Sequence, residues 1–299
     1  MESEENSTKN LLKTMFKKSI IAEFQKRESL TVAIHAGKFH ADDVFSVALL
    51  KKLCNTCDIE LKVIRTRDFK KLQKADMRVD VGGKHNPATL DFDHHQKDDP
   101  SLDQPEGIKH AAIGLLAQWC LEEDFLEIFR YKYVLGLEYQ DNMGTPHEKY
   151  SSVGFCIQPF LPAYGFEENQ NDLFWQAVSI AEIILDRAIR TTEGILKCEK
   201  ELPEETEEVL ANGKVLVLKK DMPIQEWLHP EIAFVISKAK EGYTFLSFNG
   251  ALVKKELCGL NGEALLNACG HAGVFIHKDG FTGAMATLDG AKNICLASL

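Results

Sequence analysis

The stretch that decides the fold reads Thr31-Val-Ala-Ile-His-Ala-Gly-Lys-Phe-His-Ala-Asp-Asp-Val-Phe-Ser-Val-Ala-Leu-Leu50. Its first four residues form a short apolar run, which predicts a buried strand, and a helical pattern follows from Val44 to Leu53. His35 closes the strand, and His40 and Asp42 come on the turn that leads into the helix. Open α/β sheets place their sites just beyond the carboxyl ends of strands, so these polar residues are candidates for a functional site.

The same alternation of short strands and helices continues along the chain. Strands are predicted at 60–64, 77–81 and 89–92, with helices at 69–74, 111–123 and 125–139. This order predicts an α/β protein with a doubly wound, mainly parallel sheet. A long helix at 173–201 then leads to strands at 214–218, 232–236, 243–248 and 273–276 and to a helix at 262–268, which predicts a second, smaller α/β domain.

The length of 299 residues allows two domains that share a cleft. We expect residues 1–28 to form a polar tail and an amphipathic helix that packs on the main body, and residues 29–165 to form the first domain. Residues 166–299 would then hold a linker helix and the second domain. The proline-containing loop at 158–162 marks this boundary, and the acidic run at 204–208 is typical of a solvated face.

The overall charge is acidic, at -10 near pH 7. Proteins that grip long duplex DNA carry the opposite balance, because Lys and Arg make their phosphate contacts. A small or short substrate, or one whose charge is met by bound metal, fits this composition better, although nucleic acid stays open. The eight cysteines are scattered and only Cys54 and Cys57 lie close together, which is typical of reduced, buried thiols in an intracellular protein.

No stretch approaches the ~20 apolar residues of a membrane span, so we expect no membrane partner. The first five residues, Met-Glu-Ser-Glu-Glu, are too acidic for a typical transit peptide and lack the apolar region of a signal peptide. The expected location is therefore the cytoplasm or the nucleus, and mitochondrial targeting is not supported by the acidic N-terminus. A homo-oligomer stays open.

Histidine and aspartate gather in the first half of the chain, where seven of the ten histidines lie between residues 35 and 147. Besides the residues already named, Asp80 ends the third predicted strand, Asp93-His94-His95 follows the fourth, and Asp141 comes after the helix at 125–139. A lone histidine is usually a packed core residue. Here, however, separate segments each deliver an imidazole or a carboxylate to the same edge of the sheet, which favours a metal site.

These residue types suit the transfer of a phosphoryl group to water. Two divalent cations about 3.5–4 Å apart neutralise charge on the phosphate and activate a water near neutral pH. Mixed imidazole and carboxylate ligands suit Mn²⁺, whereas pure oxygen cages suit Mg²⁺. One carboxylate must bridge the two cations, and Asp80 is the natural candidate because it ends a strand in the middle of the array, before Gly82-Gly83. We therefore expect two divalent cations, Mn²⁺ first, with Mg²⁺ as the alternative.

Five short motifs follow one another in the first half: His35-x4-His40-Ala-Asp42-Asp43, Arg65-Thr-Arg-Asp68, Val79-Asp-Val-Gly-Gly83, Asp93-His-His-Gln96 and Asp141-Asn142. In that order they resemble the Myg family, the melanocyte-proliferating-gene exonucleases of the DHH phosphoesterase superfamily. The likeness continues in Gly213–Leu218 with Pro223 and Trp227-Leu228, in Val274-Phe-Ile-His277 and in Gly280-Phe-Thr-Gly283. It covers nearly all of the chain from about residue 31.

The resemblance implies that residues 29–165 are a DHH-type, metal-binding catalytic domain and that the second domain binds substrate. It also implies manganese-dependent 3′–5′ exonuclease activity on RNA. By analogy with the superfamily, His35 and His40 would bind one metal, Asp80 would bridge, and the other metal would be bound by Asp42, His94 and Asp141. His95 would contact the phosphate, and Asp93 would orient the histidines.

Two arginines and one distant histidine are further candidates for substrate binding. Arg65 and Arg67 follow a predicted strand end, where they could contact phosphate, although an ion pair with Asp68 would explain them equally well. His277 could reach the cleft from the second domain, or it could only pack there.

The chain departs from the family pattern at two places. The family usually carries Lys-Leu-Ser-Ser-Ala-Gly, and this chain has Lys109-His-Ala-Ala-Ile-Gly114, so both hydroxyls are gone and His110 could replace their contact with phosphate. Met143 separates Asn142 from Gly144, where the family has Asp-Asn-Gly. The proposed ligands survive both changes, so substrate preference is what they affect.

The function that these observations favour is a metal-dependent phosphoesterase that cleaves RNA or short oligonucleotides from an end. One alternative is a hydrolase of a small phosphate compound, such as pyrophosphate or a cyclic dinucleotide, which the acidic charge favours. The other is a non-catalytic protein that binds nucleotide or RNA. The apparently complete set of metal ligands argues against it, and the altered segment at 109–114 argues slightly for it.

Overall fold

The computed structural model describes residues 12–299. The chain divides into two compact units, one ending at Glu193 and the other running from Gly194 to Leu299. The sequence predicts a boundary near residue 165, whereas the division falls inside one long helix, α8 (Gln170–Glu205). The first part of α8 belongs to the first unit because it is tied to the helix α3 (Ala41–Cys57) by two ion pairs, Lys51–Glu182 at 2.6 Å and Lys52–Asp186 at 2.7 Å.

The first unit is built on a five-stranded sheet in the order β2-β1-β3-β5-β4. The strands are β1 (Ser29–Ile34), β2 (Glu60–Arg65), β3 (Met77–Val79), β4 (His85–Asn86) and β5 (Asp91–Phe92). β1 pairs in parallel with β2 and with β3, and β3 pairs in parallel with β5, while the edge strand β4 is antiparallel to β5. The prediction of an α/β fold with a mainly parallel sheet is therefore confirmed.

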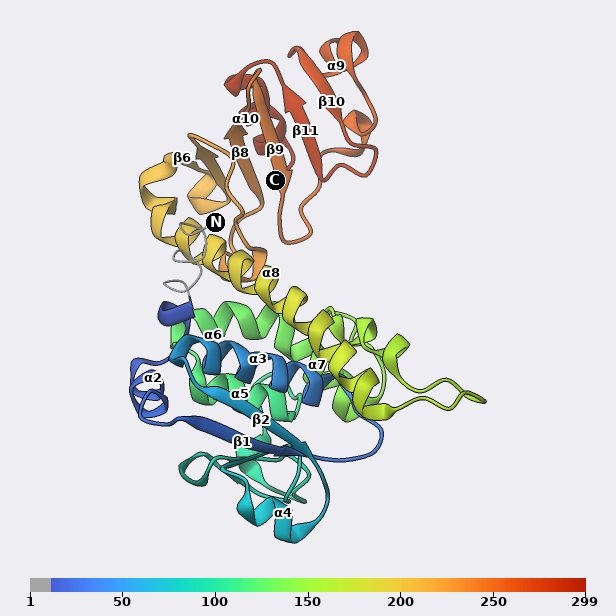
Figure 1. Cartoon of the computed structure of the whole chain (residues 1–299). Coiled ribbons are helices and arrows are strands. Elements are labelled where there is room, and N and C mark those ends of the chain that lie inside the picture. The colour runs from blue at the N-terminus through green and yellow to red at the C-terminus, as the bar shows by residue number, and fades with distance from the viewer. Residues whose placement is uncertain (1–11) are drawn as a thin grey trace. The chain divides into compact units, whose positions relative to one another are not determined.

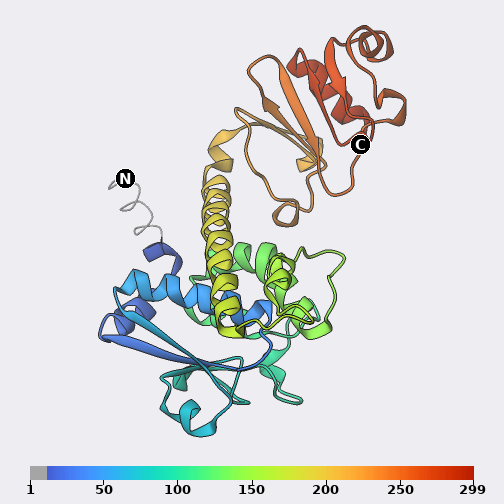
Figure 2. The same cartoon turned by 45° about the vertical axis from the view of Figure 1, so that its right-hand side comes forward.

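Helices cover both faces of this sheet. α3 lies on one side of β1 and β2, and the short helix α4 (Phe69–Lys74) lies on the other (Figures 1 and 2). On the α4 side, Leu72 packs against Ala33 of β1 and against Val81. α3 is buried on nearly all sides, because β2 and other helices of the first unit surround it. Its interior position holds the polar residues of its first turn in place.

The helical region after the sheet has more breaks than the sequence suggests. It consists of α5 (Ala112–Cys120), α6 (Glu123–Phe129), a π-helical turn at Arg130–Val134 and α7 (Leu135–Met143). The two predicted helices at 111–123 and 125–139 therefore appear as three, with the second interrupted by the π turn. Such turns are frequent near functional sites, and α7 carries Asp141.

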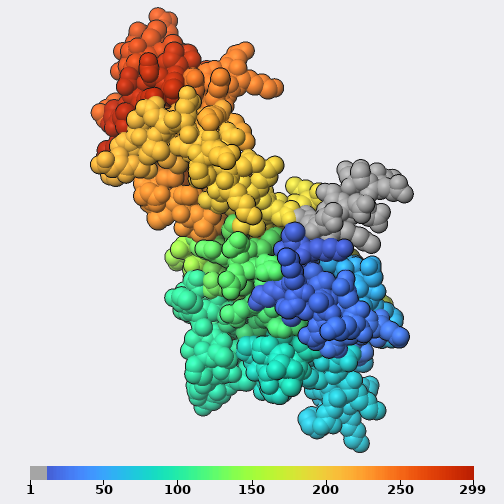
Figure 3. Space-filling view, turned by 90° about the vertical axis from the view of Figure 1, so that its left-hand side faces the viewer, coloured from blue at the N-terminus to red at the C-terminus, as the bar shows by residue number. Residues whose placement is uncertain are grey.

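The N-terminal amphipathic helix is also interrupted. Residues 12–15 are helical, but Phe16 forms a β-bridge with Leu121, and Lys17 N donates to Cys120 O at 2.8 Å before α2 (Lys18–Phe24) begins. The apolar stripe packs on the first unit as expected, since Met15, Phe16 and Phe24 are buried. In Figure 3 this blue segment lies against the green part of the unit. The acidic residues 1–11 lie outside the described residues.

The second unit has a six-stranded mixed sheet in the order β10-β11-β9-β8-β7-β6. The strands are β6 (Thr206–Leu210), β7 (Val215–Leu218), β8 (Phe234–Lys238), β9 (Tyr243–Ser247), β10 (Gly273–Ile276) and β11 (Thr282–Met285). Only β7 and β8 pair in parallel in this sheet. Two helices, α9 (Gly262–Cys269) and α10 (Leu288–Ala297), complete the unit, and its core includes Val217, Phe234 and Ile236.

Three elements of the second unit were not predicted, namely β6, β11 and α10. The acidic run at 204–208 spans the end of α8 and the start of β6, and none of its residues is buried. β6 is an edge strand, where outward-facing charges are common because they discourage pairing with other chains. None of the described helices is long and apolar enough to cross a membrane. The eight cysteines are free thiols, and Cys54 and Cys57 are buried.

Candidate metal centre

The first group of potential metal ligands lies where β1 and β3 end. His35 follows β1 directly and is buried, and its Nε2 lies 2.7 Å from Asp43 Oδ2 and 3.1 Å from Asp80 Oδ2. Asp43 is held in the first turn of α3, where its carboxylate also accepts a hydrogen bond from His40 N at 3.2 Å. Asp80 follows β3 with a φ of 54°, in the left-handed region that few residues other than glycine adopt easily.

The second group shares Asp80 with the first. Its other oxygen, Oδ1, lies 3.2 Å from His94 Nε2 and 3.5 Å from His95 Nδ1. Asp80 is the residue that the sequence predicts as the bridging carboxylate. In the structure each of its two oxygens faces a different set of imidazoles, which is the arrangement that a bridging ligand needs.

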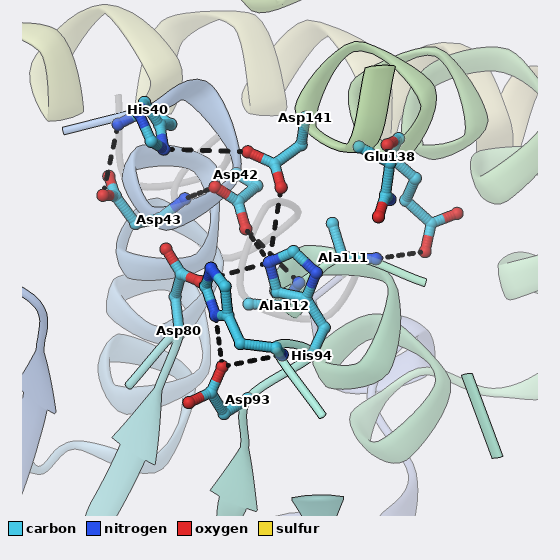
Figure 4. A network of polar contacts seen from close by, with 12 residues as sticks. His40, Asp42, Asp43, Asp80, Asp93, His94, Ala111, Ala112, Glu138 and Asp141 are labelled. Atoms are coloured by element: carbon cyan, nitrogen blue, oxygen red, sulfur yellow. Dashed lines mark hydrogen bonds and ion pairs between the residues drawn. The ribbon is translucent and has the colours of Figure 1, made fainter. Parts of the chain in front are cut away.

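The third group joins the start of α3 to the end of α7. His40 Nδ1 lies 3.8 Å from Asp141 Oδ1, and His94 Nε2 lies 3.3 Å from Asp141 Oδ2 and 3.8 Å from Asp42 Oδ2. Within each of the three groups the potential ligand atoms lie within 4.8 Å of one another. All six predicted metal ligands are thus brought together, and Figure 4 shows most of them converging on one point.

The donor atoms fit divalent cations. Asp43 Oδ1, Asp80 Oδ1 and His94 Nε2 are buried and make no hydrogen bond, although buried polar atoms are normally satisfied. His94 Nε2 faces Asp80 Oδ1 without aligning for a hydrogen bond. A cation held between such nitrogen and oxygen atoms would satisfy them. The mixture of imidazole and carboxylate suits transition ions such as Mn²⁺.

Electrostatics point the same way. Burial raises the pKa of Asp42 well above its ordinary value, and the negative charges of Asp80, Asp141 and Asp43 raise it further. Burial lowers the pKa of His35, but its hydrogen bonds to Asp43 and Asp80 outweigh this and raise it to about 10. In the metal-free chain His35 therefore carries a proton and its positive charge lies between the carboxylates of Asp43 and Asp80. A bound cation would neutralise the same two carboxylates.

Residues around the ligands fix their orientation. The Asp42 carboxylate accepts hydrogen bonds from Asp43 N at 2.8 Å and from Ala112 N, at the start of α5, at 3.3 Å. Asp93 is buried, lies 2.6 Å from His95 Nδ1 through Oδ1, and accepts from Gly83 N through Oδ2. The predicted role of Asp93 in orienting a histidine agrees with these contacts, and His95 itself is mostly exposed.

Comparison with known proteins assigns the chain to a family. The model of the MYG1_exonuc family, described as an uncharacterised protein family (UPF0160), matches residues 31–119 and 136–299. The chain belongs to the MYG1_exonuc family. The matched residues include every member of the three ligand groups. The resemblance seen in the sequence motifs is thereby confirmed.

Individual relatives extend this finding. The MYG1 protein of Dictyostelium discoideum is 26% identical, over 90% of this chain and 96% of its own length. The MYG1 exonuclease of Mus musculus is 42% identical over a short stretch, 22% of this chain and 17% of its own. The solved structure of RecJ from Thermus thermophilus in complex with Mg²⁺ is 13% identical with a TM-score of 0.26, covering 95% of this chain and 52% of that one. The α/β fold therefore rests on the strand order of this chain itself.

Within this MYG1_exonuc member, the two arginines expected to bind substrate have other partners. Arg65 donates to Gly37 O and to Asn171 Oδ1, the latter at 3.0 Å, and its guanidinium stacks on Phe174 at 4.8 Å. Arg67 Nε donates to Ala36 O at 3.2 Å. Among the described residues neither arginine forms an ion pair with Asp68, whose carboxylate accepts from Lys71 N at the start of α4.

Arg65 and Arg67 support the same loop. Both arginines hold carbonyl groups of the loop 36–39, which leads directly to His40. Gly37 gives this loop a φ of 98°, which residues other than glycine rarely adopt. These contacts hold the loop that ends at His40, and the expected contact of the two arginines with phosphate stays a prediction.

His110 has a partner inside the protein, and its expected contact with phosphate stays a prediction. It is buried, and its Nδ1 donates to Glu138 Oε1 at 2.7 Å. One ring nitrogen of His110 is thereby committed to a structural contact in the interior. Glu138 was not predicted, and Asp43 was not proposed as a ligand although it belongs to the first motif. The signal for Glu138 was a lone acidic residue in the apolar helical run Leu135-Gly-Leu-Glu138.

His277 lies in the second unit, just after β10. Asp279 N donates to its Nδ1 at 3.2 Å, and its ring lies 4.3 Å from the ring of Phe281. The ring is partly exposed, so either of its expected roles agrees with this environment. Its contact with substrate stays a prediction.

Proposed function

We propose that this chain is a metal-dependent phosphoesterase that removes nucleotides from the 3′ end of RNA or of short oligonucleotides. The observation that carries the proposal is the position of Asp80, whose two carboxylate oxygens face separate groups of imidazole nitrogens. Two cations bridged by one carboxylate are typical of enzymes that hydrolyse phosphoesters. The mouse relative is named MYG1 exonuclease, which supports the same class of reaction.

The proposed ligands are His35, His40, Asp42, Asp80, His94 and Asp141, with Asp43 added because it lies beside His35. When bound, Mn²⁺ or Mg²⁺ would neutralise charge on the phosphate and lower the pKa of a water. His40 joins Asp42 and Asp141 in one ligand group, so we assign it to the side of the site that holds those carboxylates rather than to His35 alone.

His95 is the proposed contact for the reacting phosphate. Its side chain is mostly exposed, unlike that of His94, so it can reach a molecule that arrives from solvent. Asp93 holds its Nδ1, which leaves Nε2 as the atom that would donate to a phosphate oxygen. This donation would stabilise the negative charge that develops during hydrolysis.

Two alternatives remain useful as outcomes of a test. A hydrolase of pyrophosphate or a cyclic dinucleotide would use the same metal ligands, and the net charge of -10 favours a small substrate. A protein that only binds nucleotide or RNA would have no need for two bound metals. The donor atoms left without hydrogen bonds argue against this second alternative.

The proposal is tested by metal content and by product analysis on the same preparation. Elemental analysis after Mn²⁺ loading and desalting should find about two Mn²⁺ per chain in the wild type. A 5′-labelled short RNA should shorten progressively from its 3′ end with Mn²⁺ and stay intact with EDTA. Pyrophosphate should be left largely untouched.

Two histidine variants make this test specific. His94→Gln should lose metal and turnover together, because His94 Nε2 lies beside carboxylates of two ligand groups, those of Asp80 and Asp141. His85→Gln is the matched control, since His85 is a half-buried histidine whose Nδ1 contacts Ser101. Wild-type protein that binds no Mn²⁺ would overturn the proposal. Rapid release of phosphate from pyrophosphate with intact RNA would replace it by the small-substrate alternative.

A further inference from the structure

A cavity of about 260 Å³ opens beside the candidate metal centre, within the first unit. Its wall is formed by the loop before α3, by α7 and by the segment that follows α7. The volume is on the scale of one small ligand rather than of a polymer chain. Apart from His40 and Asp141, the residues that line this cavity have no part in the proposed metal centre.

The cavity and the metal centre share two residues. His40 and Asp141 line the cavity, and the same two residues form a ligand group with Asp42. A phosphate held by that group would therefore lie at the mouth of the cavity. Whatever is attached to this phosphate would be placed inside it.

The wall combines apolar and polar side chains. Leu137, Ile157 and Leu161 provide apolar surface, and Lys38 and Gln158 provide polar groups. A bare phosphate or pyrophosphate has no apolar surface that would gain from such a wall. A nucleoside has a flat apolar ring face and polar edges, and ligand sites of this kind are mainly apolar with a few placed polar groups.

The cavity is preformed because its wall is packed tightly on α7. A Cβ atom added at Gly136 would come within 2.1 Å of Ser151 O, and one added at Gly154 would come within 2.5 Å of Gln140 Oε1. Ser152 Oγ also donates to Gln140 Oε1. The segment that carries Ile157 and Leu161 is therefore anchored close to Asp141, so little ordering is needed when a ligand binds.

We infer that this cavity is a nucleoside subsite, which holds the base and sugar of the nucleotide whose phosphate lies at the metal centre. The inference rests on the proposed function and names the part of the substrate that the site would recognise. Lys38, exposed at the edge, would lie near the phosphate, and the apolar residues would contact the base.

Binding to the full-length, Mn²⁺-loaded chain tests this inference without relying on turnover. The probes are adenosine 5′-monophosphate and inorganic phosphate, measured by isothermal titration calorimetry. The wild type should bind the nucleotide at least about tenfold more tightly than phosphate, a difference of about 1.4 kcal/mol. Leu161→Trp should fill the cavity and remove this preference while phosphate binding persists.

Two further variants keep the test decisive. Gln158→Trp adds bulk at an exposed residue of the same wall, so it serves if Leu161→Trp fails to fold. Phe155→Trp is the matched control, because Phe155 is 41% exposed and belongs to the same segment but does not line the cavity. It should bind both probes as the wild type does.

The outcomes separate this inference from the proposed function. Equal affinity of the wild type for the nucleotide and for phosphate would overturn the subsite, as would unchanged nucleotide binding in both cavity-filling variants. If the wild type and Leu161→Trp shorten RNA with the same KM, the function stands and the subsite is wrong. If nucleotide binding depends on the cavity but RNA stays intact, the subsite stands and the exonuclease proposal is wrong.

Discussion

His110 Nδ1 lies 2.7 Å from Glu138 Oε1, and both side chains are buried. Gln104 Nε2 donates to the other carboxylate oxygen at 3.0 Å, and Ala111 N, just before α5, donates to Oε1 at 3.3 Å. One carboxylate of α7 therefore fixes the start of α5, whose Ala112 N donates to Asp42. The pair sets the distance between two helices that position ligands of the candidate metal centre.

His110→Leu should lower the free energy of unfolding by about 2–4 kcal/mol, because it leaves the buried Glu138 carboxylate with one strong donor fewer. Glu138→Gln in the His110→Leu background should recover part of this loss, since a neutral amide costs less to bury than a charge. Urea denaturation of the wild type, both single variants and the double variant measures the coupling. Strictly additive effects would show that the two residues act independently.

Arg65→Met should lower the affinity for Mn²⁺ or the turnover number by about 10- to 100-fold, as expected for a residue that orients a metal ligand. Methionine retains apolar contact with Phe39 and Phe174 but loses the hydrogen bond to Gly37 O. Calorimetric Mn²⁺ titration and steady-state kinetics are the measurements. The matched control is Arg67→Met, which removes a single bond to Ala36 O and should have a smaller effect. Equal effects would show that the loop does not depend on Arg65 in particular.

Asp42→Asn should raise the thermal unfolding midpoint of the metal-free chain and abolish most of the rise that Mn²⁺ gives the wild type. Burial and the neighbouring carboxylates raise the pKa of Asp42, so its charged form is unfavourable until a cation is present. Asparagine removes that charge and keeps an acceptor for a backbone N–H. Thermal scans in EDTA and in Mn²⁺ test both statements, with the exposed Asp103→Asn as control. A lower midpoint in EDTA would contradict this account of the site.

The ion pair between Asp91 and Arg78 predicts a pH dependence of stability at a place away from the metal ligands. Burial raises the pKa of Asp91, but hydrogen bonds from Arg78 and Thr89 outweigh it and hold the pKa below its usual range. A depressed pKa means that the unfolded chain binds the proton more readily, so this stabilisation is present above the unfolded pKa of about 3.9 and is lost as pH falls through the folded value.

Asp91→Asn should therefore cost stability near neutral pH, and the difference from the wild type should shrink as the pH falls from about 5 towards 2. Denaturation in urea at several pH values measures this difference. The exposed Glu60→Gln should show little effect at any of them. A difference that is constant with pH would mean that the charge of Asp91 contributes nothing.

His277→Ala should mainly raise KM for a long RNA. If a buried hydrogen bond to substrate is lost, the rise should correspond to about 1–3 kcal/mol of binding free energy. A substrate too short to reach the second unit should be nearly unaffected. Steady-state kinetics on two substrate lengths distinguish the cases, and Asp279→Asn is the control for the loss of the ion pair between Asp279 and His277. Unchanged kinetics would make His277 a packing residue, and loss of metal would show that the proposed ligand set is wrong.

The apolar periodicity of the sequence predicts where the strands of the first unit end, and it therefore predicts which residues lie together at that edge of the sheet. The reason is that residues such as His35 and Asp80 follow strands directly, so their position depends on short-range order and on parallel pairing. Glu138 and the arginines could not be placed in this way. Whether Arg65 faces a substrate or Gly37 O depends on a loop and on α8, which are distant in sequence.

The same reasoning explains the misjudged elements. β6 is rich in glutamate and becomes a strand only because β7 lies beside it, so its own residues do not predict it. The break at Phe16 depends on pairing with Leu121, more than a hundred residues away. The cavity lined by Leu161 depends on how the segment after α7 packs, and no periodic pattern encodes that.

The backbone at Asp80 has a consequence for how this position can change over generations. Its left-handed φ of 54° suits asparagine, glycine and histidine far better than most other residues. Among the replacements that one base change can make from an aspartate codon, those three are the best tolerated by the backbone, yet none carries a carboxylate. Glutamate, which keeps the charge, fits this backbone poorly. A single amino-acid replacement at this codon therefore removes either the carboxylate that joins the two ligand groups or the backbone conformation that presents it.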